Sequence, residues 1–384
     1  MKSLQKQRPS GIQWVINNFY KLIFIFLKSR YSIFLALTIL IFSAKVFSQP
    51  SEKKTSTIPY TIEAGSLSEA DEKLSEYLLD RFAILSDKWI ADIASTQKTE
   101  QVSDPSKTDV LYKVTYQIPK SFLVDTAKIL WELNIPQFES HIYQLYDRDT
   151  IYIDTWPNVV GRPTDKTYTG NYNAFRIRNW PSWKDPDPDK KDVAATPPGP
   201  GNPLGLFVVH YDERSLRYFH GTNKPGVLKK KLRYESHGCV RNDNDNIKKM
   251  KQFILKRVVK SKDLTSWVNS KKSMTFDFDD VDKFPVRIIY KTYELNQDEQ
   301  GHYVQFFKDI YNYEGRDFSR DNWNDASLIT FTTKANIINE YNSKYGWNIP
   351  KEKIEEIVDY LLKSGKQYEK YYFEDLREQF LTKE

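Results

Sequence analysis

The spacing of apolar residues predicts helices in the N-terminal third of the chain. Between residues 67 and 93, apolar side chains recur every three or four positions, which indicates one or two amphipathic helices. Residues 110–116 alternate between apolar and polar side chains, as a strand does. Residues 126–133 predict a short helix that ends before Pro136. We therefore interpret residues 67–147 as a mixed helical domain.

From about residue 148 the pattern changes to short segments punctuated by glycine and proline. Residues 206–210, 216–220 and 286–290 are rich in β-branched and aromatic side chains, which favours strands. Residues 180–205 hold seven of the 18 prolines, and proline fits neither a helix interior nor a central strand, so a long loop is expected there. These features predict a β-rich sandwich or open barrel over residues 148–270 that carries a long Pro-rich loop.

The C-terminal part is predicted to begin with a hairpin and to continue with helices. Residues 284–315 contain two strand patterns around a turn at residues 296–301. Within residues 316–384, one segment places its apolar side chains on a single helical face (Ile354, Ile357, Val358, Leu361 and Leu362). The predicted fold class is therefore α+β, a β-rich domain flanked by helical N- and C-terminal regions.

The N-terminal segment is typical of an export signal. Residues 31–44 are uncharged and largely apolar, but this stretch is shorter than the roughly 20 residues that span a bilayer, and a cationic leader precedes it. Val46 and Ser48 are small enough for the positions before a cut ahead of Gln49. We predict a signal peptide over residues 1–48 and a tether over residues 49–66. An uncleaved anchor, which attaches the protein to the membrane, is the alternative. Either places the working domains in the periplasm or cell wall.

The charge of the chain belongs largely to this segment. The first 48 residues hold seven cations and no acid, so the formal net charge of +6 becomes +6 − 7 = −1 without them. A nearly neutral protein has no electrostatic footprint for nucleic acid. We therefore expect no nucleic-acid partner.

The chain has a single cysteine, Cys239, so it forms no internal disulfide. A lone cysteine is most often a small buried hydrophobe. Its neighbours oppose that interpretation, because Ser236-His237-Gly238-Cys239 is a polar run with a glycine directly before the thiol. We interpret this run as an environment for a reactive thiolate.

Two of the five histidines lie within nineteen residues of Cys239, and a cysteine nucleophile needs an adjacent base. His237 is expected on the same strand face as the thiol, whereas His220 reaches it from a neighbouring strand that returns in antiparallel fashion through residues 222–235. The N–H groups of Gly238 and Cys239 are candidates for holding an oxyanion. Arg241 binds a substrate carboxylate or bridges to its own fold.

These residues resemble the signature of the L,D-transpeptidase catalytic domain of the YkuD type. The family has His-Gly-Thr followed by Ser-His-Gly-Cys and an arginine, which correspond here to residues 220–222 and 236–241. Upstream elements are similar in the same order: Val160-Gly161, residues 169–172 and the Pro-rich residues 197–205. Asn242 departs from the pattern, since an apolar residue is common there, and this puts the strand after the motif in doubt.

The resemblance implies a bacterial cell-wall enzyme that acts on peptidoglycan stem peptides. Cys239 is then the nucleophile that attacks the L,D bond of a tetrapeptide stem, releases D-alanine and passes the acyl group to an amine of another stem. His220 is the base, oriented by a backbone carbonyl such as that of Gly221. The resemblance assigns oxyanion and support roles to one group of residues (Gly238, His237, Ser236 and Gly221) and substrate binding to another (Arg241 and Thr222). No cofactor or metal is needed, and carbapenem-type inhibitors are expected to acylate the cysteine as stem mimics.

Two other functions stay open at this point. A hydrolase that forms the same acyl-enzyme and uses water as acceptor cuts stems instead of joining them. A non-catalytic wall-binding protein on this fold is expected to lose the thiol or the base, and both are present here. A sortase also places histidine before cysteine, but Ser-His-Gly-Cys does not resemble its motif.

Overall fold

The computed structural model describes residues 56–102, 110–123, 128–146, 149–215, 217–259, 263–345 and 349–381. The chain divides into two units, Met1–Ser51 and Glu52–Glu384, and the first unit lies outside the described residues. The predicted signal segment, residues 1–48, therefore lies outside them as well. No helix in the described part is long and apolar enough to cross a membrane.

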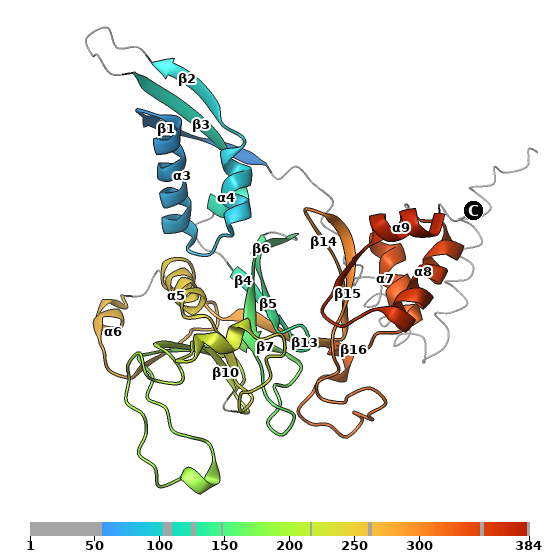
Figure 1. The fold of residues 1–384 in the computed structure, drawn as a ribbon. Coiled ribbons are helices and arrows are strands. Elements are labelled where there is room, and N and C mark those ends of the chain that lie inside the picture. Colours follow the sequence, from blue (N-terminus) through green and yellow to red (C-terminus); the bar gives the residue numbers. More distant parts are fainter. Residues whose placement is uncertain are drawn as a thin grey trace, which may run out of the picture. The chain divides into compact units, whose positions relative to one another are not determined.

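The first described module is a small sheet covered by two helices. Its strands are β1 (Thr57–Ala64), β2 (Lys98–Val102) and β3 (Leu111–Pro119), paired antiparallel in the order β1-β3-β2. Helices α3 (Leu67–Phe82) and α4 (Asp87–Ala94) lie along one side of the sheet (Figure 1). The side chain of Ser66 caps α3 by accepting a hydrogen bond from the Glu69 N–H. The helices confirm the expectation for residues 67–93, but the predicted tether is wrong over β1, which alternates into the core.

The main sheet has eleven strands and curls into an open half-barrel, which confirms the expected α+β class (Figure 1). The strand order is β12-β8-β9-β10-β11-β6-β5-β4-β13-β16, and β7 pairs with β13. The strands are β4 (Lys128–Asn134), β5 (Glu139–Tyr146), β6 (Asp149–Val159), β7 (Gly170–Ala174), β8 (Arg176–Asn179), β9 (Phe207–His210), β10 (Tyr218–His220), β11 (Val240–Asn242), β12 (Met274–Asp277), β13 (Phe284–Lys291) and β16 (Ile329–Thr330).

Strand β4 corrects one prediction from the sequence. The helix expected over residues 126–133 is a strand that pairs with β5 and, in parallel, with β13. Both faces of β4 are buried, including Glu132 and Asn134, so the alternation that marks a half-exposed strand is absent. The predicted boundary at residue 148 also falls inside the sheet, because β5 pairs with β6 across it.

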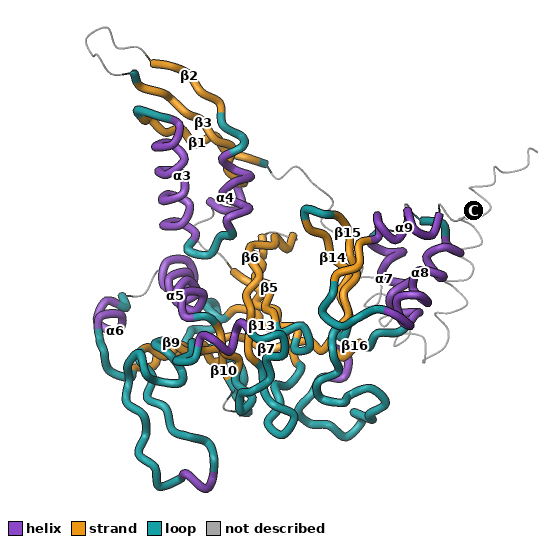
Figure 2. Tube along the Cα trace, in the orientation of Figure 1, coloured by secondary structure: helices purple, strands orange, loops and turns teal. Residues whose placement is uncertain are grey.

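The connections around the large sheet follow the expected pattern. The Pro-rich residues 180–206 run as a long loop between β8 and β9, interrupted by one 3-10 turn at Pro188–Lys190 (Figure 2). Helix α5 (Asn244–Phe253) buries Ile247, Met250 and Phe253 and continues as a wider π-helical turn, Ile254–Val258. The remaining short elements are α6 (Thr265–Asn269) and 3-10 turns at Lys120–Leu123, Pro225–Lys229 and Ala326–Leu328.

A C-terminal module has a hydrophobic core of its own. Strands β14 (Tyr293–Asp298), β15 (Gly301–Phe306) and β17 (Lys370–Tyr372) form an antiparallel sheet. They accompany helices α7 (Lys334–Lys344), α8 (Lys351–Ser364) and α9 (Phe373–Leu381). A hairpin is present over β14 and β15, but the predicted bounds of 284–315 are wrong, because residues 284–291 form β13 of the large sheet. Helices are present within residues 316–384. The helices bury a cluster that is separate from the core of the large sheet, and Ile354, Ile357, Val358 and Leu361 belong to it as expected.

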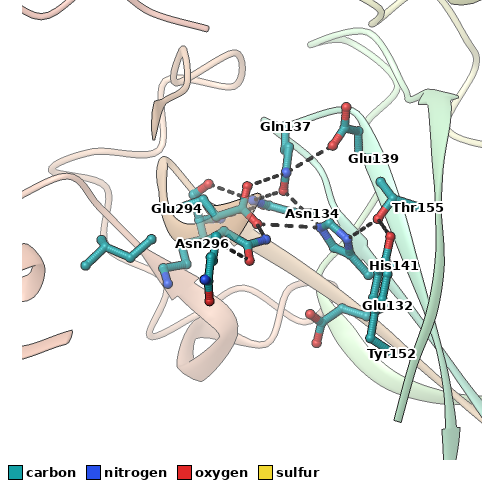
Figure 3. A network of polar contacts seen from close by, with 12 residues as sticks. Glu132, Asn134, Gln137, Glu139, His141, Tyr152, Thr155, Glu294 and Asn296 are labelled. Carbon is teal, nitrogen blue, oxygen red and sulfur yellow. Dashed lines mark hydrogen bonds and ion pairs between the residues drawn. The ribbon is translucent and has the colours of Figure 1, made fainter. Parts of the chain in front are cut away.

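A polar network lies where β14 meets the large sheet (Figure 3). Gln137 Nε2 donates to Glu294 Oε2 at 2.6 Å and to Glu139 Oε2 at 3.1 Å. His141 Nδ1 lies 2.9 Å from Thr155 Oγ1, and its Nε2 lies 4.0 Å from Glu294 Oε1. Burial raises the pKa of Glu139, to which the neighbouring Glu294 contributes. The amide of Gln137 therefore joins a carboxylate of the large sheet to one of the hairpin.

Candidate active site

The two predicted reactive segments lie on neighbouring strands. Strand β10 pairs with β11 in parallel, with Phe219 opposite Val240 and His220 opposite Arg241. The antiparallel return expected through residues 222–235 is therefore wrong. That segment instead crosses back so that β11 starts at the same end of the sheet as β10. Phe219 and Val240 are fully buried in the core, so alternation turns Tyr218, His220 and Arg241 to the opposite face.

The ring of His220 is held by its own loop. The Nδ1 atom donates a hydrogen bond of 2.6 Å to the carbonyl of Gly221, as expected, because a carbonyl oxygen can only accept. This bond places the proton on Nδ1 and leaves the lone pair on Nε2. Burial, together with the positive charge of Arg241, lowers the pKa of His220 to about 3. The imidazole is therefore neutral at physiological pH, with an unprotonated Nε2.

Cys239 directly precedes β11 and is partly buried. Burial raises the pKa of its thiol to about 11, although hydrogen bonds from Tyr218 and the charges of Arg217 and Arg241 act in the opposite direction. A reactive thiolate at Cys239 stays a prediction, and with this pKa it requires a base such as His220. The raised pKa favours the thiol form, because burial destabilises the thiolate more than the charges of Arg217 and Arg241 stabilise it.

The glycine before the cysteine sets the path of the nucleophile loop. Gly238 has a φ of +99°, a conformation that glycine adopts without strain. Its N–H donates to Ser236 Oγ at 3.1 Å, and that hydroxyl donates in turn to the Cys239 carbonyl at 2.5 Å. The Gly238 N–H is therefore committed to the buried Ser236. The oxyanion role of the Gly238 and Cys239 N–H groups stays a prediction, and for Gly238 it requires this bond to open.

His237 does not share a strand face with Cys239. It is exposed in a bend, and the positive φ of Gly238 separates it from β11. The predicted same-face placement is wrong, because the chain turns between the two residues.

The two predicted substrate-binding residues have different surroundings. Arg241 lies opposite His220 and is partly buried, which lowers the pKa of its guanidinium group. Thr222 is buried, and its hydroxyl accepts from the Lys224 N–H at 3.0 Å. The Asn244 side chain bonds with both backbone groups of Thr222. Its Oδ1 accepts from the Thr222 N–H at 3.0 Å, and its Nδ2 donates to the Thr222 carbonyl at 2.8 Å. Thr222 thus fixes the loop after His220 and is not exposed to substrate.

Asn242, the departure from the family pattern, is accommodated by polar neighbours. Its Oδ1 accepts from Asn158 Nδ2 at 2.8 Å, and Asn158 Oδ1 accepts from Ser140 Oγ at 2.5 Å. Asn242 Nδ2 lies 3.4 Å from the carbonyl of His220. The strand that the sequence left in doubt is present, and this buried chain links β11 to β6 and β5.

Two residues of the site were missed in the sequence. Tyr218 hydrogen-bonds with Cys239, and its ring centroid lies 5.9 Å from that of His220. Its position two residues before His220 on one strand was an available signal. Arg217 Nε donates to the Lys166 carbonyl at 2.6 Å and lies against Gly238. No local pattern indicates this contact, because it joins residues 51 positions apart. In the described part of the chain, no group of three His, Cys, Asp or Glu side chains is arranged to hold a metal ion.

Comparison with known families gives a match over the large sheet. Residues 134–288 match the model of the L,D-transpeptidase catalytic domain, which is less than half of the chain. The match includes His220, Gly221 and the segment 236–241. It confirms the resemblance that the motifs indicated. No curated protein matches the chain.

Solved structures with a similar arrangement include three bacterial proteins. An L,D-transpeptidase from Mycobacterium smegmatis is 11% identical, with 61% of this chain and 91% of that chain covered and a TM-score of 0.24. L,D-transpeptidase 3 from Mycobacterium tuberculosis, in complex with a faropenem-derived adduct, is 15% identical, with 43% and 81% covered and a TM-score of 0.24. The helical cell shape determining protein from Campylobacter jejuni is 14% identical, with 59% and 56% covered and a TM-score of 0.24.

Proposed function

Because residues 134–288 belong to the L,D-transpeptidase catalytic domain family, we propose that the protein is an exported peptidoglycan L,D-transpeptidase. The observation that supports this best is the state of His220, whose Nδ1–H is tied to Gly221 so that Nε2 is free of a proton on the strand next to Cys239. A neutral histidine beside a neutral thiol is a general-base pair.

The proposed first half-reaction forms an acyl-enzyme. The Cys239 sulfur attacks the carbonyl carbon of the L,D peptide bond as His220 Nε2 removes the thiol proton. The tetrahedral intermediate collapses, the C–N bond breaks, and His220 returns the proton to the departing amine of D-alanine. A thioester between the stem and Cys239 remains.

The second half-reaction restores the enzyme. An amine of another stem, or of a wall-attached protein, attacks the thioester carbon while His220 accepts the amine proton and then delivers it to the leaving sulfur. If water takes the place of the amine, the same steps give an L,D-carboxypeptidase or endopeptidase. Arg241, on the same face as His220, is suited to a carboxylate of the bound stem.

The test is product analysis by mass spectrometry with purified protein and a disaccharide-tetrapeptide substrate. We expect D-alanine release together with a cross-linked dimer, and one carbapenem per chain on Cys239, the single thiol. Cys239→Ala is expected to give neither product nor adduct. His220→Ala is expected to lose about 10²–10⁴-fold in acylation rate, as the removal of a general base does.

His237→Ala is the matched control, since it removes the same side chain from an exposed bend in the same motif. It is expected to change the acylation rate by less than about tenfold. A stem shortened by hydrolysis without a dimer identifies the hydrolase. Folded wild-type protein that releases no D-alanine and takes no carbapenem contradicts the proposal and favours a wall-binding protein. Export is tested separately, by sequencing the N-terminus of the cell-derived protein, which is expected near Gln49.

A further inference from the structure

The nucleophile loop rests directly on another backbone segment. Gly161 forms a parallel bridge with Ser236, and a Cβ atom at Gly161 would lie 2.9 Å from the Gly238 Cα and 2.1 Å from the Asp165 carbonyl. No real side chain tolerates such distances, so only glycine allows this approach. The position of Gly238, and with it Cys239, therefore depends on how Gly161 is held.

Thr167 connects these two glycines through its hydroxyl. Thr167 Oγ1 accepts from the Gly161 N–H at 3.0 Å and donates to the Gly238 carbonyl at 2.8 Å. Thr167 has no exposed surface, so neither bond competes with water. The Thr167 hydroxyl thus acts both as acceptor and as donor, and it joins Gly161 to Gly238.

The second support comes from outside the matched catalytic domain. The hydroxyl of Tyr311 donates to the Gly161 carbonyl at 2.7 Å and accepts from the Thr167 N–H at 3.1 Å. Tyr311 is 4% exposed, and its own N–H donates to Tyr290 Oη at 3.0 Å. Tyr311 follows β15, in the part of the chain beyond residue 288. Together Thr167 and Tyr311 occupy the N–H and the carbonyl of Gly161.

We propose that Tyr311 and Thr167 are positioning residues for Cys239, and that the segment after β15 thereby completes an active site whose reacting groups lie in the catalytic domain. The proposal rests on the proposed function for its rate readout, but not for its structural readout. It accounts for a buried tyrosine hydroxyl that bonds with two backbone groups, the Gly161 carbonyl and the Thr167 N–H, next to the loop that carries Cys239.

The rate experiment uses the full mature chain and the carbapenem acylation rate of Cys239. Tyr311→Phe and Thr167→Val each remove the hydroxyl with little change of shape. Each is expected to lower the acylation rate by about 10–10²-fold, since a misplacement of about 1 Å costs up to about 10²-fold. Thr167→Ser keeps the hydroxyl and is expected within about threefold of wild type. Because both residues support the same contact between Gly161 and Gly238, the loss in the double variant is expected to be smaller than the two single losses combined.

Tyr313→Phe is the matched control. Tyr313 is equally buried and lies two residues from Tyr311, but its hydroxyl donates to Asn324 Oδ1 at 3.3 Å and does not touch Gly161 or Thr167. It is expected to stay within about threefold of wild-type acylation. Equal losses in Tyr311→Phe and Tyr313→Phe, or no loss in Thr167→Val, overturn the proposal.

The structural readout is the pH dependence of Cys239 alkylation by iodoacetamide, which needs no transpeptidase activity. In the wild type, alkylation is expected to follow the raised pKa of about 11. In Tyr311→Phe and Thr167→Val, a loosened loop admits water, so the apparent pKa is expected to move down toward the ordinary value of 9.0. A wild type that is never acylated but shows this shift refutes the proposed function alone. Variants with an unchanged alkylation profile overturn the positioning role alone.

Discussion

The two side chains of the proposed catalytic pair, His220 and Cys239, have pKa values that favour their neutral forms. Burial is the first cause in each case, since it lowers the pKa of His220 to about 3 and raises that of Cys239 to about 11. In the proposed reaction the thiol proton therefore moves to His220 as the sulfur attacks the substrate carbonyl. Arg217 and Arg241 favour the sulfur anion and so assist that step without forming the thiolate beforehand.

The pH dependence of acylation follows from this state. Acylation needs neutral His220 and a Cys239 thiol, so the activity is lost as pH falls through about 3, where the base becomes protonated. Between about pH 5 and pH 9 both groups keep their reactive form, and the carbapenem acylation rate is expected to change by less than about threefold. In His220→Ala the thiolate has to form unaided, so the residual rate is expected to rise about tenfold per pH unit. A wild-type rate with that same slope contradicts the neutral pair.

Sequence could predict those residues of the site whose contacts are local. The His220–Gly221 bond joins neighbours, and Cys239 stands out as the single thiol in a polar run. The protonation state could not be predicted, because it depends on burial by strands that are distant in sequence. The commitment of the Gly238 N–H to Ser236 was also beyond reach, since it depends on a turn that the motif letters do not fix.

At the scale of elements, a chain of buried amides holds the short strand β11 in register. Three residues form this strand, and β6 is its antiparallel neighbour, with Arg241 opposite Val159 and Asn242 opposite Asn158. The Asn158–Asn242 side-chain bond runs alongside that pairing. Burying two amides that hydrogen-bond with each other has little effect on the free energy of unfolding. Removing one of them lowers that free energy, because the other amide is left buried without its partner.

Asn242→Val is therefore expected to lower the free energy of unfolding by about 1–3 kcal/mol, because Asn158 Nδ2 loses its 2.8 Å acceptor in a buried site and keeps only the Arg241 carbonyl at 3.5 Å. Asn173→Val makes the same change at an exposed position of β7 and is expected within about 0.5 kcal/mol of wild type. Denaturant titration followed by circular dichroism measures both. Equal small effects contradict a structural role for the amide pair.

Elements with a clear period were predictable, and those buried on both faces were not. Helix α3 buries one face, and the four-residue spacing of its buried side chains is visible in the sequence (Ala70, Leu74, Leu78 and Phe82). Strand β4 buries both faces, so its apolar run fits a helix equally well, and only its place between β5 and β13 makes it a strand. The parallel pairing of β10 with β11 depends on how residues 222–235 cross the sheet, for which the sequence has no signal.

At the scale of the whole molecule, the described residues have two separate hydrophobic clusters. One fills the N-terminal module and the large sheet, and the other lies among β14, β15 and helices α7 to α9. The polar network around Gln137 and Glu294 connects β14 to the large sheet without merging these cores (Figure 3). Tyr368 also stacks on Phe138 of the large core, with ring centroids 5.9 Å apart. Modules with separate cores open with separate free energies.

Core truncations are therefore expected to act within their own cluster. Ile357 in α8 and Ile288 in β13 are both fully buried, and replacement by alanine is expected to cost about 2–5 kcal/mol at each site. Hydrogen exchange of separate segments under mild denaturant distinguishes the two. Ile357→Ala is expected to speed exchange in residues 334–381 while residues 207–242 stay protected and Cys239 is still acylated at the wild-type rate. Ile288→Ala is expected to expose residues 207–242 as well as its own strand, because β13 belongs to the core beneath the nucleophile. If both variants open both regions to the same extent, the two clusters form one cooperative unit.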